Sequence, residues 1–323
     1  MSENTRKHGA AHIFKGANAS TITILIIFAI MCVSLIFATN GAFIDKTNIT
    51  NVARAFSAYA IAGLGVSMVI MLGGIDISIC AIYGLAGVIA ALSIKAGVPA
   101  FPAILLGLLT GAACGAFNAV LVIYCKLPPY IATLGTQQIF RGICYITTRG
   151  YPISGLGEKF LWLGQSYILG IPIAVYAMAI ITILFAVFRN HTTTGRRIFA
   201  LGGNEEATRI SGINVIRLKF LCFILSGVTA AFAGILNASK LGVCQPTAGN
   251  GFEMDAIASV VIGGSSLSGG EGTVVGTIIG AAIIGVLRNA LVLLSVDSYF
   301  QTLIIGTVII IAVSIDQIRK SKG

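Results

Sequence analysis

Charge is scarce in this chain of 323 residues: Asp, Glu, Lys and Arg make up 10% of it, against about 25% in an ordinary soluble protein. Hydrophobic residues make up 56%. So few charged side chains cannot cover the core of a soluble fold of this length with a polar surface. The composition therefore excludes a water-soluble enzyme and indicates a protein whose surface faces lipid.

Histidine and paired cysteines are scarce as well, and a nucleotide-binding loop is missing. The three His lie in the predicted tail, at positions 8 and 12, and in a loop, at position 191, and not within the predicted spans, which argues against a metal site or a proton relay built on histidine. The seven Cys have no paired metal-ligand spacing and fall mostly in apolar stretches, so we expect small buried side chains. No Gly-x-x-x-x-Gly-Lys-Ser/Thr segment occurs, so the chain itself is not expected to bind ATP.

Long apolar runs are what the sequence has instead, and a membrane-spanning helix needs about 20 apolar residues. The runs lie at 21–38, 57–72, 78–94, 100–124, 129–148, 170–188, 218–239, 254–268, 273–293 and 299–315. They predict an all-α, polytopic integral membrane protein with about ten transmembrane segments. The three short runs, 57–72, 78–94 and 254–268, allow broken or re-entrant segments, so eight or nine full spans fit the same sequence.

The distribution of basic residues orients the chain. With ten spans, thirteen of the 21 Lys and Arg fall on the side of the N-terminus and six on the other side. The positive-inside rule then places both termini in the cytoplasm. We expect an N-terminal tail over 1–20, one transmembrane domain over 21–316 with a cytoplasmic loop at 189–219, and a C-terminal tail over 317–323. No cleavable signal is predicted, so the first span stays as an anchor.

The two halves of the chain resemble each other. The glycines of one half recur 165 residues later in the other: Gly107, Gly111 and Gly115 as Gly272, Gly276 and Gly280. Glycines four apart line one face of a helix and allow a neighbouring helix to approach closely. With five spans in each unit, the repeat predicts an inverted-repeat architecture, which is common in transporters. The alternative is that two Gly-rich membrane helices resemble each other by chance.

The loop at 189–219 is the longest charged stretch and contains a predicted short helix. Asn204 is suited to cap its first turn, and Glu205 and Glu206 suit the positive end of the helix dipole. Gly212 is placed to end the helix. This pattern indicates a deliberate helix of about two turns in the cytoplasm.

The same helix carries an apolar stripe. Ala207, Ile210 and Ile213 fall at steps of three, with Glu206 and Arg209 beside them. A helix this short is not stable alone. The stripe therefore needs a partner surface, either the membrane ends of this chain or a second cytoplasmic protein.

Polar residues within the predicted spans are candidates for function, because burying them in a membrane is costly. Gln137 and Arg141 share a helix face and are expected to line a translocation path, unless Arg141 extends toward the outer end. Asn118 and Asn289, at matching positions of the repeat, are expected to bond between helices or to contact substrate. The candidate path residues are Thr133, Gln137, Arg141, Asn118 and Asn289.

Two glycine pairs mark predicted breaks or hinges in the membrane. Gly73 and Gly74 precede Asp76, which is expected to cap the next helix, with a role in gating as the alternative. Gly263 and Gly264 form the second pair. Near the latter, Glu253 and Asp255 are expected to be solvated charges of the outer rim, or to meet basic groups of a docking protein.

Four segments in this order resemble the signatures of one family. They are Gly73-Gly74-Ile75-Asp76-Ile77-Ser78, Leu127-Pro128-Pro129-Tyr130-Ile131-Ala132-Thr133-Leu134-Gly135, the stretch from Ala200 to Val215, and Gly263-Gly264-Ser265-Ser266-Leu267-Ser268-Gly269-Gly270. Within the third, residues 206–212 are similar to the Glu-Ala-Ala-x-x-x-Gly loop of permease subunits in ATP-binding-cassette importers, with Thr208 in place of the second Ala. Over 45–316, the chain resembles the ribose-type permeases of the branched-chain amino acid/ribose-type permease family.

The resemblance implies partner proteins, one of which uses ATP and Mg²⁺. The loop helix would be the coupling helix that docks on an ATP-binding cassette ATPase subunit, which uses ATP and Mg²⁺. A periplasmic or extracellular sugar-binding protein would deliver substrate, and the permease would form a homodimer or pseudo-dimer. The location implied is the bacterial inner membrane, in contact with lipid and without nucleic acid. Residues 267–271 nearly match an ATPase signature, which we interpret as coincidence.

The function expected is import of a monosaccharide, such as ribose, by alternating access, without an enzymatic step in this chain. The sequence does not identify the sugar. The alternative is a secondary transporter driven by an ion gradient, which the inverted repeat equally permits but which needs buried carboxylates to bind the coupling ion.

Overall fold

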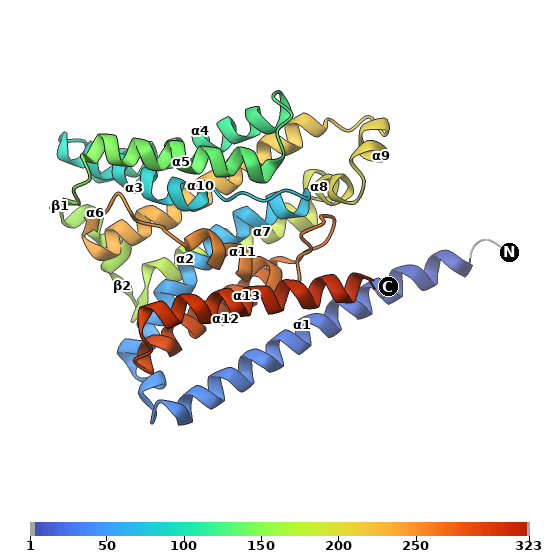
Figure 1. The fold of residues 1–323 in the computed structure, drawn as a ribbon, viewed down its shortest axis with the longest axis horizontal. Helices are drawn as coiled ribbons and strands as arrows, with labels where there is room; N and C mark the ends of the chain where they lie inside the picture. Colours follow the sequence, from blue (N-terminus) through green and yellow to red (C-terminus); the bar gives the residue numbers. More distant parts are fainter. Residues whose placement is uncertain (1–3, 322–323) are drawn as a thin grey trace.

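The computed structural model describes residues 4–321, so the first three and last two residues of the predicted tails lie outside it. Most of the described chain is helical (Figure 1). Its helices are α1 (Asn4–Ala38), α2 (Lys46–Met71), α3 (Ile79–Lys95), α4 (Ala100–Ile123), α5 (Pro129–Thr148), α6 (Glu158–Gln165), α7 (Ile173–His191), α8 (Thr193–Gly203), α9 (Glu205–Ile210), α10 (Val215–Leu241), α11 (Phe252–Ile262), α12 (Val274–Leu293) and α13 (Ser298–Ser321), with one 3-10 turn, η1 (Ala42–Ile44).

Four short strands lie at the end of the bundle opposite α9 (Figure 1). Strand β1 (Ile153–Ser154) pairs antiparallel with β4 (Val243–Cys244). Strand β2 (Tyr167–Ile168) pairs antiparallel with β3 (Ile171–Pro172) and forms a hairpin between α6 and α7. These pairs tie together the loops at that end.

The helices confirm the predicted class of an all-α polytopic membrane protein. Every one of the ten predicted runs coincides with a helix. Among the described residues, six helices are long and apolar enough to cross a membrane: α1 from Thr21, α2, α4, α7, α10 and α12. The predicted boundaries at 20 and 316 fall inside α1 and α13, because both helices continue beyond their apolar parts.

Two of the short runs have different bounds in the structure. The predicted span at 57–72 is the last part of the 26-residue α2, which begins at Lys46 because the Asp45 side chain accepts a hydrogen bond from Thr47 N at 2.8 Å. The run at 254–268 is a broken segment, as the sequence allows, and not a full crossing. Helix α11 has 11 residues, about 16 Å of helix, whereas a bilayer core is about 30 Å thick.

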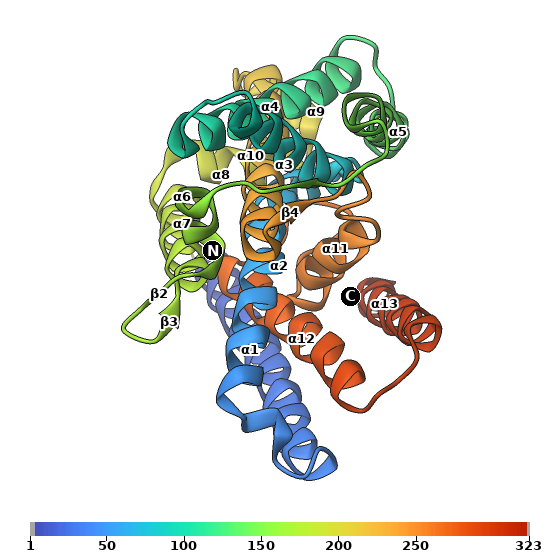
Figure 2. The same ribbon diagram turned by 90° about the vertical axis from the view of Figure 1, so that its left-hand side faces the viewer.

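Packing between the halves follows the predicted repeat. Helix α4 packs against α10 and α3, and its counterpart α12 packs against α2 and α11. Likewise α5 packs against α3, and α13 against α11. Figure 2 shows α2 and α10 at the centre, with α3, α5, α11 and α13 on one side. Each half therefore packs its helices on the central helix of the other half.

The repeated glycines lie at these helix contacts. A Cβ added at Gly111 or Gly115 of α4 would overlap the backbone of α10, and one at Gly276 or Gly280 of α12 would overlap the backbone of α11. Glycine is thus required for the observed distance between the helices. The glycine rows serve packing, as the sequence predicts, but Gly272 lies before the start of α12 and is therefore not on its helix face.

The core is built around α2. Buried residues run without interruption from Ala60 to Met71, whereas 6% of the apolar part of α1 is buried. Helix α1 is therefore placed to face lipid. Five of the seven Cys are buried as expected, but Cys125, in the turn after α4, is exposed.

Candidate functional site

The predicted loop helix is present as α9. Asn204 Oδ1 accepts a hydrogen bond from Ala207 N at 2.8 Å, and Glu205 and Glu206 occupy the first turn. Gly212 follows the helix with φ of +77°, a conformation that favours glycine. Each local signal in the sequence therefore has its expected place in the structure.

The apolar stripe begins on α9, where it faces away from the bundle, and ends at Ile213, which follows the helix and packs against the core. The Ile210 side chain is 77% exposed, Ala207 is exposed and Ile213 is half-buried. The one buried residue of the helix is Thr208, whose hydroxyl donates to the Asn204 carbonyl oxygen at 2.8 Å. The described part of this chain therefore leaves Ala207 and Ile210 uncovered and covers Ile213 in part.

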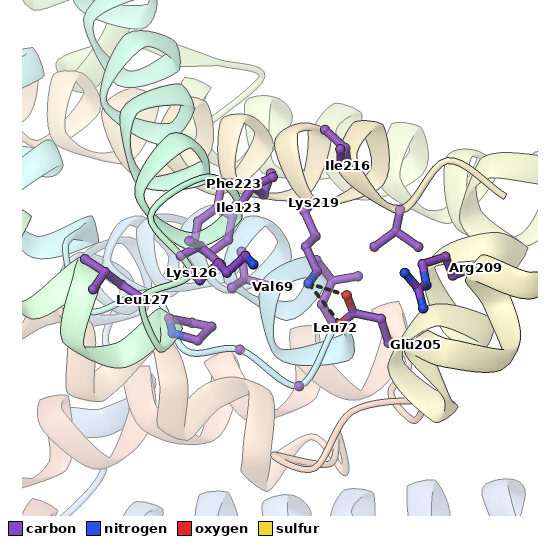
Figure 3. A pocket seen from close by; sticks show the side chains of 15 residues that line it. Val69, Leu72, Ile123, Lys126, Leu127, Glu205, Arg209, Ile216, Lys219 and Phe223 are labelled. Atoms are coloured by element: carbon purple, nitrogen blue, oxygen red, sulfur yellow. Dashed lines mark hydrogen bonds and ion pairs between the residues drawn. The ribbon is translucent and has the colours of Figure 1, made fainter.

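Two ion pairs flank the stripe. Arg209 and Glu206 meet at 2.7 Å on the exposed face, and this hydrogen-bonded pairing raises the pKa of Arg209. Lys219 of α10 and Glu205 meet at 2.7 Å (Figure 3). The second pair is the ionic link between α9 and the membrane helices, and such a partly exposed pair contributes about 0–1 kcal/mol.

A cavity of about 550 Å³ lies beneath this ion pair. It separates α9 and the start of α10 from the ends of α2 and α4, and Figure 3 shows Lys126, Lys219 and Arg209 around it. Because this space lies between α9 and the bundle, α9 does not pack flush against the membrane helices. The Lys219–Glu205 ion pair spans part of this space.

Helix α8 connects α9 to both membrane breaks. A Cβ on Gly202 would overlap the Met71 carbonyl oxygen and approach Gly270 N. Gly270 N in turn donates to the Met71 carbonyl oxygen at 3.0 Å, and Gly269 lies close to Gly73. We call these five residues the glycine junction: Met71, Gly73, Gly202, Gly269 and Gly270. Here three chain segments meet backbone to backbone.

Arg189 makes further contacts beside the glycine junction. Its guanidinium donates to the Gly272 carbonyl oxygen and lies over the Phe199 ring, 4.6 Å from the ring centroid. The end of α7, helix α8 and the segment before α12 are thus connected. Helix α8 therefore lies in contact with elements of both halves.

The first break, between α2 and α3, contains the fully buried Asp76. One carboxylate oxygen accepts hydrogen bonds from Ser78 N at 3.1 Å and from Ser78 Oγ at 2.6 Å. The other accepts from Ser226 Oγ of α10 at 2.7 Å. Asp76 therefore organises the turn into α3, as a capping role requires, and also joins this turn to α10.

Two candidate path residues extend this network. Asn118 Nδ2 donates to Ser78 Oγ at 2.7 Å, and Thr136 Oγ1 donates to Asn118 Oδ1 at 2.6 Å. Thr133 Oγ1 accepts from Ile77 N at 3.1 Å, next to the same break. All three side chains are fully or almost fully buried. The geometry brings Asn118 and Thr133 together around the break.

Arg141 is buried and bound to backbone carbonyl oxygens. Its guanidinium donates to Pro246 at 2.6 Å, to Ala248 at 2.8 Å and to Cys80 at 3.0 Å. It therefore holds the segment before α11 against α3, and it does not extend to the outer end as the alternative expected. Gln137, one turn away, is half-buried, and its Oε1 has no hydrogen-bond partner in the described part of the chain.

Asn289 lies apart from this group. Its amide exchanges hydrogen bonds with Asn48 at 2.6 and 3.1 Å, which fastens α12 to the start of α2. Arg288 beside it pairs with Asp255 at 2.7 Å. Asp255 is 2% exposed and Glu253 is 8% exposed, so the expectation of solvated rim charges is wrong. Their burial arises because the short α11 is sunk among α2, α3 and α12.

The second break begins where α11 ends. A Cβ on Gly263 would overlap the backbone of Gly276, and Gly264 has φ of +85°. Glycine is thus needed at both positions, for close approach at the first and for the turn at the second. This break leads directly into the glycine junction.

Sequence reasoning missed the contacts that join these pieces. The Gly202-Gly203 pair was visible, but only the fold shows that Gly202 packs and Gly203 does not. Ser226 was a polar residue inside a span, which was a usable signal. Lys219 lies outside the helix and gave no signal of its pairing with Glu205.

Comparison with known proteins identifies the family. Residues 48–313 match the model of the branched-chain amino acid transport system / permease component family. The chain is 43% identical to a ribose import permease of Bacillus subtilis, with 88% of this chain and 89% of that protein covered. It is 40% identical to the ribose import permease of Escherichia coli K12, covering 90% and 92%.

A further relative is named for the transport of a different sugar. The D-allose transport system permease of Escherichia coli K12 is 38% identical over 85% of each chain. No solved structure matches the chain. The match to the family model covers most of the protein and includes both breaks and the loop with α8 and α9, so the chain belongs to the branched-chain amino acid transport system / permease component family.

Proposed function

We propose that the chain is the membrane-spanning subunit of an ATP-driven importer that moves a monosaccharide into the cytoplasm by alternating access. The observation that carries this proposal is the capped helix α9, whose apolar stripe includes an Ile210 that is 77% exposed. A short helix with an uncovered apolar face is suited to dock on another protein. The chain supplies a transport route, and the partner ATPase uses ATP and Mg²⁺.

The relatives support the substrate class. Two are named ribose import permeases, and others are named for D-allose and xylose transport. Ribose is our first candidate because the two ribose permeases are 43% and 40% identical to this chain, against 38% and 32% for the allose and xylose permeases. A sugar-binding protein outside the cell would deliver the substrate, and two permease copies would enclose the path.

The orientation supports the placement of the ATPase. Helix α1 begins, and α13 ends, at the end of the molecule that carries α8 and α9 (Figure 1). Together with the excess of basic residues on that side, this arrangement supports cytoplasmic termini and a cytoplasmic loop at 189–219. The membrane would be the bacterial inner membrane.

The contacts suggest how motion of the ATPase would reach the membrane. A displacement of α9 would pull on α8, which meets Met71 and Gly270 at the glycine junction. From there it would reach both breaks, and through Asp76 and Ser226 it would reach α10. Helices α3 and α11, which follow and precede the breaks, would then change their tilt to open one side or the other.

The candidate path residues keep separate roles in this proposal. Asn118 and Thr133 would hold the first break, Asn289 would fasten α12 to α2, and Arg141 would position the segment before α11. Gln137 is the one whose side-chain oxygen lacks a partner among the described residues, so it is the best candidate to meet a sugar hydroxyl.

Reconstitution tests the proposal against the ion-gradient alternative, which the family membership does not favour. Proteoliposomes containing the permease, its ATPase and its binding protein should accumulate labelled ribose only when ATP is supplied to the ATPase side. Omitting the ATPase should abolish uptake, and ionophores should not. Uptake that persists without the ATPase and collapses with an ionophore would overturn the proposal.

A further inference from the structure

A second cavity, of about 220 Å³, lies at the end of the bundle opposite α9. It is bounded by residues 54–59 of α2, by the first turns of α7 and α11, by α3 and α6, and by the last turns of α10. Three aromatic rings form one wall: Tyr59 stacks on Phe252 with centroids 5.4 Å apart, and Tyr83 lies 4.5 Å from Phe252. The mechanism proposed above makes no use of this cavity.

Two cationic side chains face the cavity and no carboxylate does. Arg54 and Lys240 line it, together with Asn237, and no Asp or Glu is among the described residues that do so. Two like charges repel each other, and each loses hydration where protein surrounds it. Asp255 of α11 is already paired with Arg288. The cavity therefore holds positive charge that its own lining does not compensate.

The cations also have unused hydrogen-bonding capacity. Arg54 donates from Nη2 to the Gln165 carbonyl oxygen at 2.8 Å and lies over the Tyr167 ring, but its buried Nε has no partner among the described residues. No bonded acceptor is found for Lys240 Nζ within the same part of the chain. An unpaired buried donor is costly, so the site favours an anion with several acceptor oxygens, as phosphate has.

The surroundings point to a lipid as the source of that phosphate. The hairpin that follows Gln165 exposes an apolar surface: Tyr167, Ile168, Leu169 and Ile171, with Leu169 94% exposed. Trp162 of α6 is also exposed, and Trp and Tyr are enriched where proteins meet the membrane interface. Below the cavity, α7 exposes Ile180, Ile183 and Leu184. Acyl chains along α7 would place a head group beside Ala174.

We propose that this cavity binds the phosphate of an anionic phospholipid, held by Arg54 and Lys240, in the leaflet at the end opposite α9. The aromatic wall and Asn237 would contact the rest of the head group. The lipid would stabilise the packing of α2 against α10 and against the β2–β3 hairpin that follows α6. This inference requires neither the ATPase nor the sugar of the proposed function.

Binding to the purified, delipidated permease tests the inference. Native mass spectrometry with phosphatidylglycerol and with phosphatidylcholine should show at least tenfold tighter binding of the anionic lipid. The double variant Arg54→Gln/Lys240→Gln should lose that preference. The matched double variant Arg149→Gln/Lys159→Gln removes the same charge from the same end outside the cavity, and it should keep the preference. Arg54→Lys, which preserves the charge, should retain most of it.

Each other outcome overturns the inference. Equal binding of both lipids would show that the cavity does not select an anionic head group. Equal loss of the preference in the two double variants would show that the preference depends on the general charge at this end and not on the cavity. Inorganic phosphate binding that depends on Arg54 and Lys240, without preference between the lipids, would assign the site to a free anion. Unchanged lipid binding with lost capture of the sugar-binding protein would assign the two cations to a protein carboxylate.

Discussion

At the scale of single residues, the interior of this protein is organised by polar side chains that join different helices. Asp76 is bonded to Ser226 of α10, and Asn118 of α4 is bonded to Ser78. Arg141 holds three carbonyl oxygens at once. Because each of these buried groups has a protein partner, removing one leaves the other unsatisfied, at about 1–3 kcal/mol.

Arg141→Ala should therefore destabilise the protein. The substitution leaves the carbonyl oxygens of Pro246, Ala248 and Cys80 without their donor, so we expect a loss of about 2 kcal/mol or more in unfolding free energy. Arg149→Ala, at an exposed position at the end of the same helix, is the control and should change little. Thermal unfolding in detergent measures both. A stable Arg141→Ala protein with impaired uptake would instead place Arg141 in the path.

Asp76→Asn separates a structural carboxylate from one that binds a coupling ion. Asn keeps the shape and an acceptor oxygen for Ser78, and the Ser226 hydroxyl is able to rotate and accept from the new amide. We expect ATP-driven uptake to fall less than threefold, whereas Asp76→Ala should lose both fold stability and uptake. Complete loss of uptake in a well-folded Asp76→Asn protein would support the ion-gradient alternative.

At the scale of elements, local signals predicted the start and end of α9 but not what it touches. Asn204, Glu205 and Gly212 act within one or two turns, so the sequence contains everything needed to place them. The bounds of α2 and α11 were harder. The Asp45 cap extends α2 through a polar segment, and α11 ends at Ile262, where Gly263 lies against Gly276 and Gly264 turns the chain with φ of +85°. The spacing of apolar residues predicts neither the start of α2 nor the end of α11.

Gly202→Ala should disrupt the glycine junction, with Gly203→Ala as its neighbouring control. A Cβ at Gly202 would overlap the Met71 carbonyl oxygen, while one at Gly203 meets nothing within 4 Å. We expect the first variant to lose about 1–3 kcal/mol of unfolding free energy or to shift α8. The importer assembled with it should take up at least tenfold less sugar per ATP that the ATPase subunit hydrolyses. The control should match wild type. Equal coupling ratios in the two variants would show that the junction does not transmit motion.

At the scale of the whole molecule, helices of each half pack on the central helix of the other half: α4 on α10, and α12 on α2. The recurrence of Gly111 as Gly276 predicted a close backbone contact in each half, and both are present, but with different partners: Gly111 lies against α10, whereas Gly276 lies against Gly263 directly after α11. The burial of Asp255 and Glu253 was not predictable in this way, because it depends on how deep α11 lies between helices distant in sequence. Likewise, the cations at Arg54 and Lys240 come together only through the fold.

The central claim is that α9 transmits the motion of a separate ATPase, and cross-linking at Ile210 tests it most directly. Ile210→Cys should be made with Cys125→Ser, because Cys125 is the exposed native thiol at this end. In membranes containing the whole importer, we expect an adduct with the ATPase subunit whose yield changes when ATP binds. Leu169→Cys, at the opposite end, should give none. An Ile210→Cys yield no higher than that of Leu169→Cys would contradict the account.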